Sequence, residues 1–238
     1  MYNGTIHILH LVDGAKRARG LTVIIDVFRA FSVECYLMSF GASAVYAVGG
    51  IDEARALSAA LPGSVTVGER RGVRLPGFDF GNSPSQILPE AVKDRPVIHT
   101  TSAGTQGIVN AKGASEILTG SLVNASAIAR YIEKTGPEEV SLVAMGVMGT
   151  EEAPEDELCA SYIRSLLTGD GAFDIDGRIR YLKEHGGAKF FDPAQQEVYP
   201  EMDYWMSTDR DRFGFVLRAE REGDHFRMKK ICVEGTGR

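Results

Sequence analysis

Leu21-Thr-Val-Ile-Ile-Asp-Val-Phe-Arg29 is the most apolar strand-like stretch of this 238-residue chain. Its run of branched apolar residues is typical of a strand buried on both faces, as in a parallel sheet covered by helices. A carboxylate and a guanidinium do not belong in such an interior unless they are paired or emerge at its mouth. Asp26 and Arg29 therefore predict a polar site at the carboxyl edge of the sheet, where open α/β folds bind ligands.

Strand-like and helix-like segments alternate from about residue 20 to residue 168. This alternation predicts a three-layer α/β/α domain with a mostly parallel sheet. We expect strands at 21–27, 44–48, 64–68, 96–100, 114–118 and 139–145, and helices at 31–41, 52–61, 84–92, 104–111, 123–134 and 155–168. Residues 5–12 are expected to add an edge strand.

The sequence changes in character beyond Gly169. Residues 177–185 look helical, and residues 186–211 are rich in Pro, Asp and Tyr. Two β-rich runs, 213–220 and 226–233, flank Glu222-Gly223-Asp224 and predict an antiparallel hairpin. We therefore expect an α/β/α core over 1–172 and a C-terminal extension over 173–238, which packs on that core and is not independent.

Composition narrows the class of protein. A hydrophobic content of 44% and a charged content of 24% are ordinary for a globular domain. The net charge of −6 argues against a nucleic-acid partner. Three cysteines fit a reducing cytoplasm, and neither a signal peptide nor a membrane span is recognisable. We expect a cytoplasmic protein that binds no membrane, and composition leaves open whether it forms a homo-oligomer.

Two polar segments follow predicted strands and suit anions. Residues 69–83 hold three arginines within six positions, and the planar guanidinium fork suits phosphate or carboxylate. Residues 99–105 carry four hydroxyls where a helix begins, which would cradle an oxyanion. The alternatives are a solvated loop whose charges pair with one another and an ordinary Ser/Thr cap.

An acidic segment, 151–156, follows the predicted strand 139–145 and contains four carboxylates. Acids in a first helical turn are favoured by the helix macrodipole, which is the simple explanation. Mg²⁺ also prefers such oxygen ligands, usually one or two carboxylates together with substrate phosphate. From the residues alone, both interpretations stay open.

Taken together, these segments resemble the 2-phosphosulfolactate phosphatase family. The residues that carry the resemblance are Val23-Ile-Ile-Asp-Val-Phe-Arg-Ala30, Gly68-Glu-Arg-Arg-Gly72, Gly77-Phe-Asp-Phe-Gly-Asn-Ser-Pro84, Thr100-Thr-Ser-Ala-Gly-Thr105, Gly120-Ser-Leu-Val-Asn-Ala125 and Glu155-Asp-Glu-Leu-Cys-Ala160. The resemblance implies an α/β/α fold and Mg²⁺-dependent hydrolysis of the phosphate ester of a 2-hydroxy acid. In the family's named role the product is sulfolactate, on the route to coenzyme M.

The resemblance also implies roles for individual residues. Asp26 is the expected catalytic carboxylate, with Glu69 as the alternative, and Asp26, Glu155 and Asp156 are the expected Mg²⁺ ligands. The expected substrate-binding residues are Arg29, Arg70, Arg74, Asp79, Asn82, Thr100, Thr101, Gly104 and Thr105. The threonine loop departs from the family pattern, because Ser102-Ala103 makes it one residue longer.

Several alternatives remain at this stage. Spacing does not decide between direct attack by water and an aspartyl-phosphate intermediate. The substrate could be another phosphorylated 2-hydroxy acid, such as phospholactate or phosphoglycolate. A rival of a different class is a non-catalytic module that binds an anionic metabolite at the same cationic mouth. The acidic segment weighs against that module, because an anion binder gains nothing from extra carboxylates.

Overall fold

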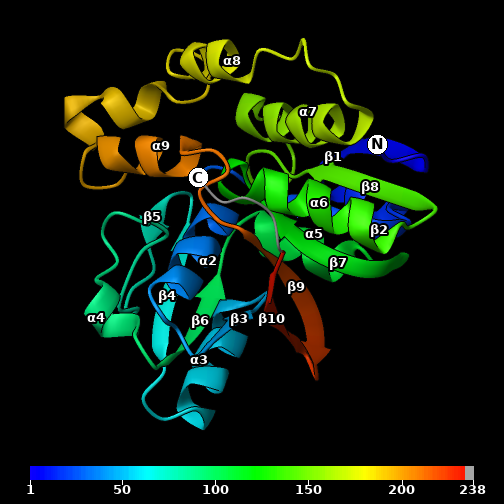
Figure 1. Cartoon of the computed structure of the whole chain (residues 1–238). Helices are drawn as coiled ribbons and strands as arrows, with labels where there is room; N and C mark the ends of the chain where they lie inside the picture. The colour runs from blue at the N-terminus through cyan, green and yellow to red at the C-terminus, as the bar shows by residue number, and fades with distance from the viewer. Residues whose placement is uncertain (234–238) are drawn as a thin grey trace.

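A computed structural model describes residues 1–233, which form one mixed, mostly parallel sheet of ten strands with helices packed on it (Figure 1). The strand order is β1 (Thr5–His10), β8 (Glu139–Ala144), β2 (Gly20–Ile25), β7 (Ala114–Gly120), β9 (Phe215–Glu222), β10 (His225–Cys232), β3 (Ala44–Ala47), β6 (Pro96–Thr100), β4 (Val65–Arg70) and β5 (Val73–Arg74). The first four strands pair in parallel, as do β3, β6 and β4. The predicted strands are confirmed, and β1 lies at the sheet edge as expected.

The C-terminal hairpin β9–β10 joins the two parallel halves of the sheet. β9 pairs with β7 and β10 pairs with β3, both antiparallel. Figure 1 shows the hairpin in red between the green and the blue strands. Val216 and Leu217 are fully buried on opposite faces, because strands in the middle of a sheet are covered on both sides. The predicted β-rich runs thus form central strands.

The helices cover both faces of the sheet. They are α1 (Leu11–Arg17), α2 (Ala30–Ser39), α3 (Ile51–Ala60), α4 (Pro89–Val92), α5 (Gly104–Asn110), α6 (Ala125–Thr135), α7 (Pro154–Thr168), α8 (Ile175–Leu182) and α9 (Glu201–Thr208), with 3₁₀ turns η1 (Leu122–Asn124), η2 (Ala188–Phe191) and η3 (Pro193–Gln195). Ile24 of β2 packs in one apolar cluster with α1 and α5, whereas Val23 and Ile25 pack in another with α6 and α7. The prediction of a strand buried on both faces is therefore confirmed.

The helix expected over 84–92 is wrong for most of its length, because only α4, a single turn, forms there. Leu88 precedes Pro89 and is extended, with φ −81° and ψ 119°. A residue before proline is pushed out of the helical region by the proline ring. Upstream, the backbone N–H of Ser85 donates to Asp203 at 3.0 Å, so the turn is held by a distant carboxylate.

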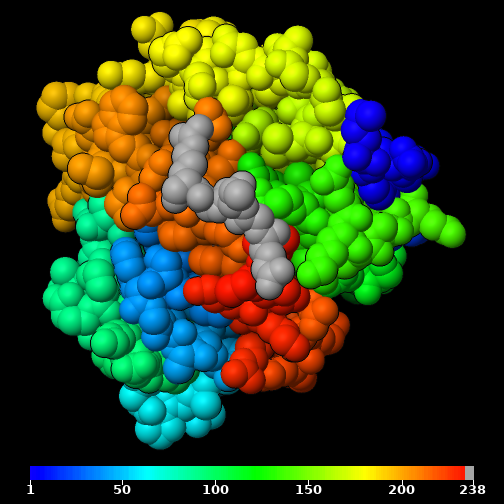
Figure 2. Space-filling view, viewed as in Figure 1, coloured from blue at the N-terminus to red at the C-terminus, as the bar shows by residue number. Residues whose placement is uncertain are grey.

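The C-terminal tail packs at the carboxyl end of β2. Phe190 of η2 and Tyr204 of α9 are buried in the same cluster as α7 and α8, and the Phe28 ring lies 5.0 Å from that of Phe190. Figure 2 shows the orange α9 region between the yellow α7–α8 region and the blue and cyan part of the chain. Within residues 1–233, no helix has the length and apolar character that a membrane crossing requires.

Candidate active site

A cavity of about 330 Å³ opens at the carboxyl ends of the parallel strands. Its wall comes from the loops after β2, β4, β5, β6 and β8, from the end of β4, from the first turn of α7, from η2, and from the segment between η3 and α9. Six of the residues that sequence analysis singled out lie in this wall: Asp26, Arg29, Glu69, Asn82, Glu155 and Asp156. The strand ends therefore bring together side chains that are up to 130 positions apart, Asp26 and Asp156 being the extremes among the carboxylates.

Asp26 follows the last residue of β2 and is 7% exposed. Its Oδ1 accepts a hydrogen bond from the backbone N–H of Ala30, at 3.1 Å, where α2 begins. Burial raises the pKa of Asp26 to about 7, and the negative charges of Glu69 and Glu155 add to the rise. Among the described residues, nothing donates a hydrogen bond to its Oδ2, so this oxygen is available to a ligand.

Two acids in the first turn of α7 face the same cavity. Asp156 accepts N–H donors from Val27 through Oδ1 and from Gly146 through Oδ2, each at 2.8 Å, and so ties the loops after β2 and β8 together. Glu155 has a buried Oε2 that lacks a hydrogen-bond partner within residues 1–233. Burial raises the pKa of both carboxyls, and neighbouring carboxylates raise that of Asp156 further.

These oxygens fit a hard divalent cation. The Oε2 atom of Glu155 is an orphaned acceptor beside other carboxylates, and such an atom calls for a cation or a proton. Within residues 1–233, no three His, Cys, Asp or Glu side chains converge to hold a metal by themselves. Mg²⁺ does not require three, because it retains water and shares oxygens with a substrate phosphate.

Glu69, the alternative catalytic carboxylate, has both oxygens engaged. Its Oε1 accepts from the backbone N–H of Ser102 at 2.8 Å, and its Oε2 accepts from that of Gly72 at 2.7 Å. The side chain thereby joins the β4–β5 turn to the loop before α5. This use of both oxygens favours a positioning role for Glu69 and leaves Asp26 with the freer carboxylate.

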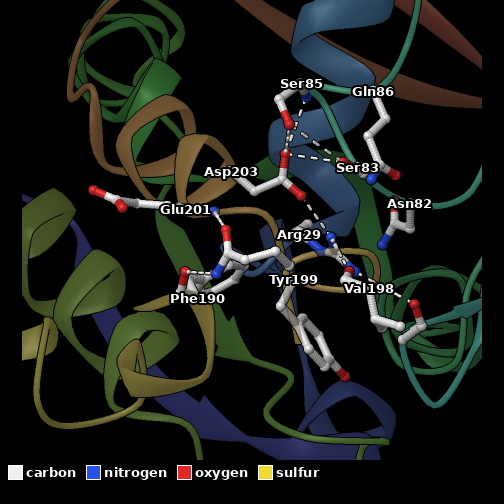
Figure 3. Close-up of polar contacts among 12 residues, drawn as sticks. Arg29, Asn82, Ser83, Ser85, Gln86, Phe190, Val198, Tyr199, Glu201 and Asp203 are labelled. Atoms are coloured by element: carbon white, nitrogen blue, oxygen red, sulfur yellow. Dashed lines mark hydrogen bonds and ion pairs between the residues drawn. The ribbon is translucent and has the colours of Figure 1, made fainter. Parts of the chain in front are cut away.

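Arg29 is 4% exposed and connects the β2 end to the tail. Its Nη1 donates to Asp203 Oδ2 at 2.5 Å and to the carbonyl oxygen of Val198 at 2.9 Å, as Figure 3 shows. Asp203 Oδ1 also accepts from the hydroxyls of Ser83 and Ser85. The guanidinium is therefore fixed by a satisfied buried ion pair, while one side of Arg29 still lines the cavity.

Seven expected substrate-binding residues lie outside the cavity wall: Arg70, Arg74, Asp79, Thr100, Thr101, Gly104 and Thr105. Arg74 and Asp79 line an adjoining groove that shares Arg29 and Asn82 with the cavity. Asp79 Oδ2 accepts from the N–H and the hydroxyl of Thr66, which fixes the loop that carries Asn82.

The threonine loop packs beneath the site. Arg70 Nη2 donates to the hydroxyl of Thr100 at 3.2 Å, and the hydroxyl of Thr105 donates to the carbonyl of Thr101 at 3.0 Å. A Cβ at Gly104 would lie 2.9 Å from the Phe31 ring and 3.1 Å from Asp26 Oδ2. Glycine at this position therefore lets α5 approach the carboxylate closely.

Sequence reasoning missed Lys189, Tyr199 and Asp203, which the tail brings to the site. Lys189 of η2 is half-buried in the cavity wall. Burial lowers its pKa, while the neighbouring Glu155 acts in the opposite direction. Its Nζ lies 5.2 Å from the ring centroid of Tyr199. No local pattern marks Lys189, because its role depends on how the tail folds back.

Comparisons with a family model and with individual known proteins agree on one family. A family model described as 2-phosphosulpholactate phosphatase matches residues 6–185. Relatives named "Probable 2-phosphosulfolactate phosphatase" include one from Bacillus subtilis strain 168, which is 26% identical over 235 residues, 98% of each chain. One from Caldanaerobacter subterraneus subsp. tengcongensis is 38% identical over 215 residues, 89% of this chain and 82% of the relative. One from Deinococcus radiodurans is 33% identical over 178 residues, 74% of this chain and 72% of the relative.

Proposed function

Because the chain belongs to the 2-phosphosulfolactate phosphatase family, a family of phosphoric monoester hydrolases, we propose that it hydrolyses 2-phosphosulfolactate to sulfolactate and phosphate with Mg²⁺ as cofactor. The observation that carries this proposal is one cavity in which the carboxylates Asp26, Glu155 and Asp156 face the cations Arg29 and Lys189. Such a mixture suits a substrate that brings several negative charges and a metal ion that offsets them.

The residues divide into two groups by charge. Arg29 and Lys189 would bind the acidic groups of the substrate, because their positively charged side chains lie in the cavity wall. Glu155 would hold the Mg²⁺ ion, since its Oε2 is a buried acceptor without a donor among residues 1–233. Asp26 and Asp156 lie beside it and would add negative charge, although both oxygens of Asp156 already accept backbone N–H groups. A bound Mg²⁺ ion would offset negative charge on the transferring phosphoryl group.

Asp26 is the proposed proton acceptor. Its Oδ2 would take a proton from the attacking water as the new P–O bond forms and the ester P–O bond breaks, and that proton would then pass to the leaving 2-oxygen of sulfolactate. Oδ2 is the candidate atom because, within residues 1–233, only Oδ1 of Asp26 accepts a hydrogen bond from the protein. Glu69 is the weaker candidate, since both of its oxygens already accept backbone hydrogen bonds.

The test is phosphate release from 2-phosphosulfolactate, 2-phospholactate and phosphoglycolate, each measured with Mg²⁺ and with excess EDTA. We expect metal-dependent release that is fastest with the sulfonate. Faster release from one of the other esters would reassign the substrate and keep the reaction. Release that is unaffected by EDTA would remove Mg²⁺ from the proposal. Tight binding of the acids without any release would favour the non-catalytic binding module.

We propose a cytoplasmic location on separate grounds. All three cysteines are free thiols, and Cys35 and Cys159 are buried, which is consistent with a reducing compartment. Cell fractionation with antibodies against the native protein tests this directly. Whether the chain forms a homo-oligomer is a matter for light scattering on the purified protein.

A further inference from the structure

A buried row of three polar side chains leads from α2 to the cavity wall. Glu34 on α2 and His99 on β6 are each 0% exposed, and Asn82 is 5% exposed. Glu34 Oε1 lies 3.1 Å from His99 Nδ1, and His99 Nε2 lies 3.0 Å from Asn82 Oδ1. Burying a carboxyl and an imidazole together costs free energy, so their contact with a residue of the site invites a functional explanation.

The hydrogen bonds in this row fix the Asn82 amide. An amide oxygen only accepts, so His99 Nε2 must carry a hydrogen and donate to Asn82 Oδ1. The other ring nitrogen, Nδ1, is in hydrogen-bond contact with Glu34 Oε1, so the ring is held from both sides. With Oδ1 taken by His99, the Nδ2 group of Asn82 is left on the other side of the amide.

Asn82 borders both the cavity and the adjoining groove, and Arg29 borders both as well. Figure 3 shows the Asn82 amide with its nitrogen on the side of Arg29. Within residues 1–233, Asn82 Nδ2 has no acceptor. Asn82 Nδ2 is thus an N–H donor that borders the cavity on the side of the positively charged Arg29, which is an arrangement that suits an anionic oxygen.

We propose that Glu34 and His99 are positioning residues, which hold the Asn82 amide with Nδ2 as a hydrogen-bond donor to an anionic group of the substrate. This inference rests on the proposed function, because it requires an anionic substrate in the cavity. Without His99, the amide can rotate and present its oxygen to that anion. Hydrogen bonds to charged groups are strong enough that such a rotation is expected to raise KM by roughly tenfold or more.

Two substitutions of His99 separate positioning from simple packing. His99→Gln places an amide nitrogen near the former Nε2 and can still donate to Asn82, whereas His99→Asn reaches only toward Glu34. We expect a KM close to that of the native protein for His99→Gln and a KM raised roughly tenfold for His99→Asn, with a smaller change in kcat. His7→Gln is the matched control, since His7 also contacts a glutamate, Glu139 at 3.0 Å, but lies outside the cavity wall.

Asn82→Asp tests the donor itself. The variant keeps the oxygen that accepts from His99 and replaces Nδ2 with a second, negatively charged oxygen. We expect weaker binding of inorganic phosphate by calorimetry, by roughly tenfold or more, in a variant whose circular dichroism spectrum is that of the folded protein. Unchanged phosphate affinity would overturn the proposal.

The protonation of His99 gives a readout that needs no substrate. In ¹⁵N NMR of the native protein, Nε2 of His99 should show the chemical shift of a protonated ring nitrogen. An unprotonated Nε2 would mean that Asn82 donates to His99 and presents its oxygen to the cavity, which would refute the inference even if the His99 variants do not fold. Absence of phosphatase activity in the native protein, with Nε2 protonated and phosphate bound through Asn82, would refute the proposed function alone.

Discussion

Replacing Asp26 with Asn is expected to abolish turnover and also to stabilise the metal-free fold at alkaline pH. The pKa of Asp26 rises from its ordinary 3.8 to about 7, chiefly because the carboxyl is buried. Between these two values the unfolded chain has released the proton and the folded chain still holds it, so stability falls as the pH rises through this window. Asparagine carries no charge to desolvate and can still accept from Ala30 through Oδ1.

The magnitude follows from the two pKa values. Each unit by which a pKa rises corresponds to about 1.4 kcal/mol. A rise of the Asp26 pKa from 3.8 to about 7 therefore means that the ionised carboxylate lowers the free energy of unfolding by about 4 kcal/mol above pH 7. For a chain of this length, each kcal/mol moves the unfolding midpoint by roughly 2–4 °C. Asp26→Asn should therefore unfold on the order of 10 °C higher than the native protein at pH 8, and at the same temperature at pH 3.

The assay is thermal unfolding in EDTA from pH 3 to pH 8.5, together with phosphate release in Mg²⁺. Asp52→Asn is the control, because the Asp52 carboxylate is fully exposed and its removal should leave both curves unchanged. Equal midpoints for Asp26→Asn and the native protein at pH 8 would refute the burial argument. Turnover that survives in Asp26→Asn would remove Asp26 from the mechanism.

Three further outcomes are expected. Asp203→Ala should lower the free energy of unfolding in urea by about 3–5 kcal/mol, because Arg29 is left as an unpaired buried cation. The control Asp209→Ala, which removes an exposed ion pair, should lower it by less than about 1 kcal/mol. Glu155→Gln should weaken Mg²⁺ binding by roughly tenfold or more in calorimetry, and unchanged affinity would place the ion elsewhere. Glu69→Gln should raise KM more than it lowers kcat, because it weakens the hydrogen bond to Ser102 and leaves the proposed proton acceptor, Asp26, intact. A loss of kcat without a change in KM would indicate that Glu69 is the base.

The residue pattern along the chain predicted secondary structure correctly where interactions between neighbouring residues decide it. The apolar run of β2 predicted a strand covered on both faces, and Ile24 and Ile25 pack on opposite sides of the sheet. It failed over 84–92, where Ser83-Pro84 ahead of Ile87 and Leu88 suggested the start of a helix. There Pro89 and the distant carboxylate of Asp203 outweigh helix propensity, since each removes or redirects a backbone N–H that the helix would need.

The amino-acid sequence by itself determined which chemistry stands at the strand ends. Asp26 follows β2, Glu69 lies next to the last residue of β4, and Glu155 lies in the first turn of α7, and parallel strands bring their carboxyl ends to one edge. Only the tertiary structure decided their neighbours. Arg29 donates a hydrogen bond to Asp203, which lies 174 residues further along the chain, and Lys189 of the C-terminal tail lines the cavity. Strand pairing and buried charge pairing depend on the packing of the whole chain. The local sequence pattern therefore does not predict which hairpin completes the sheet or which cation lies next to which carboxylate.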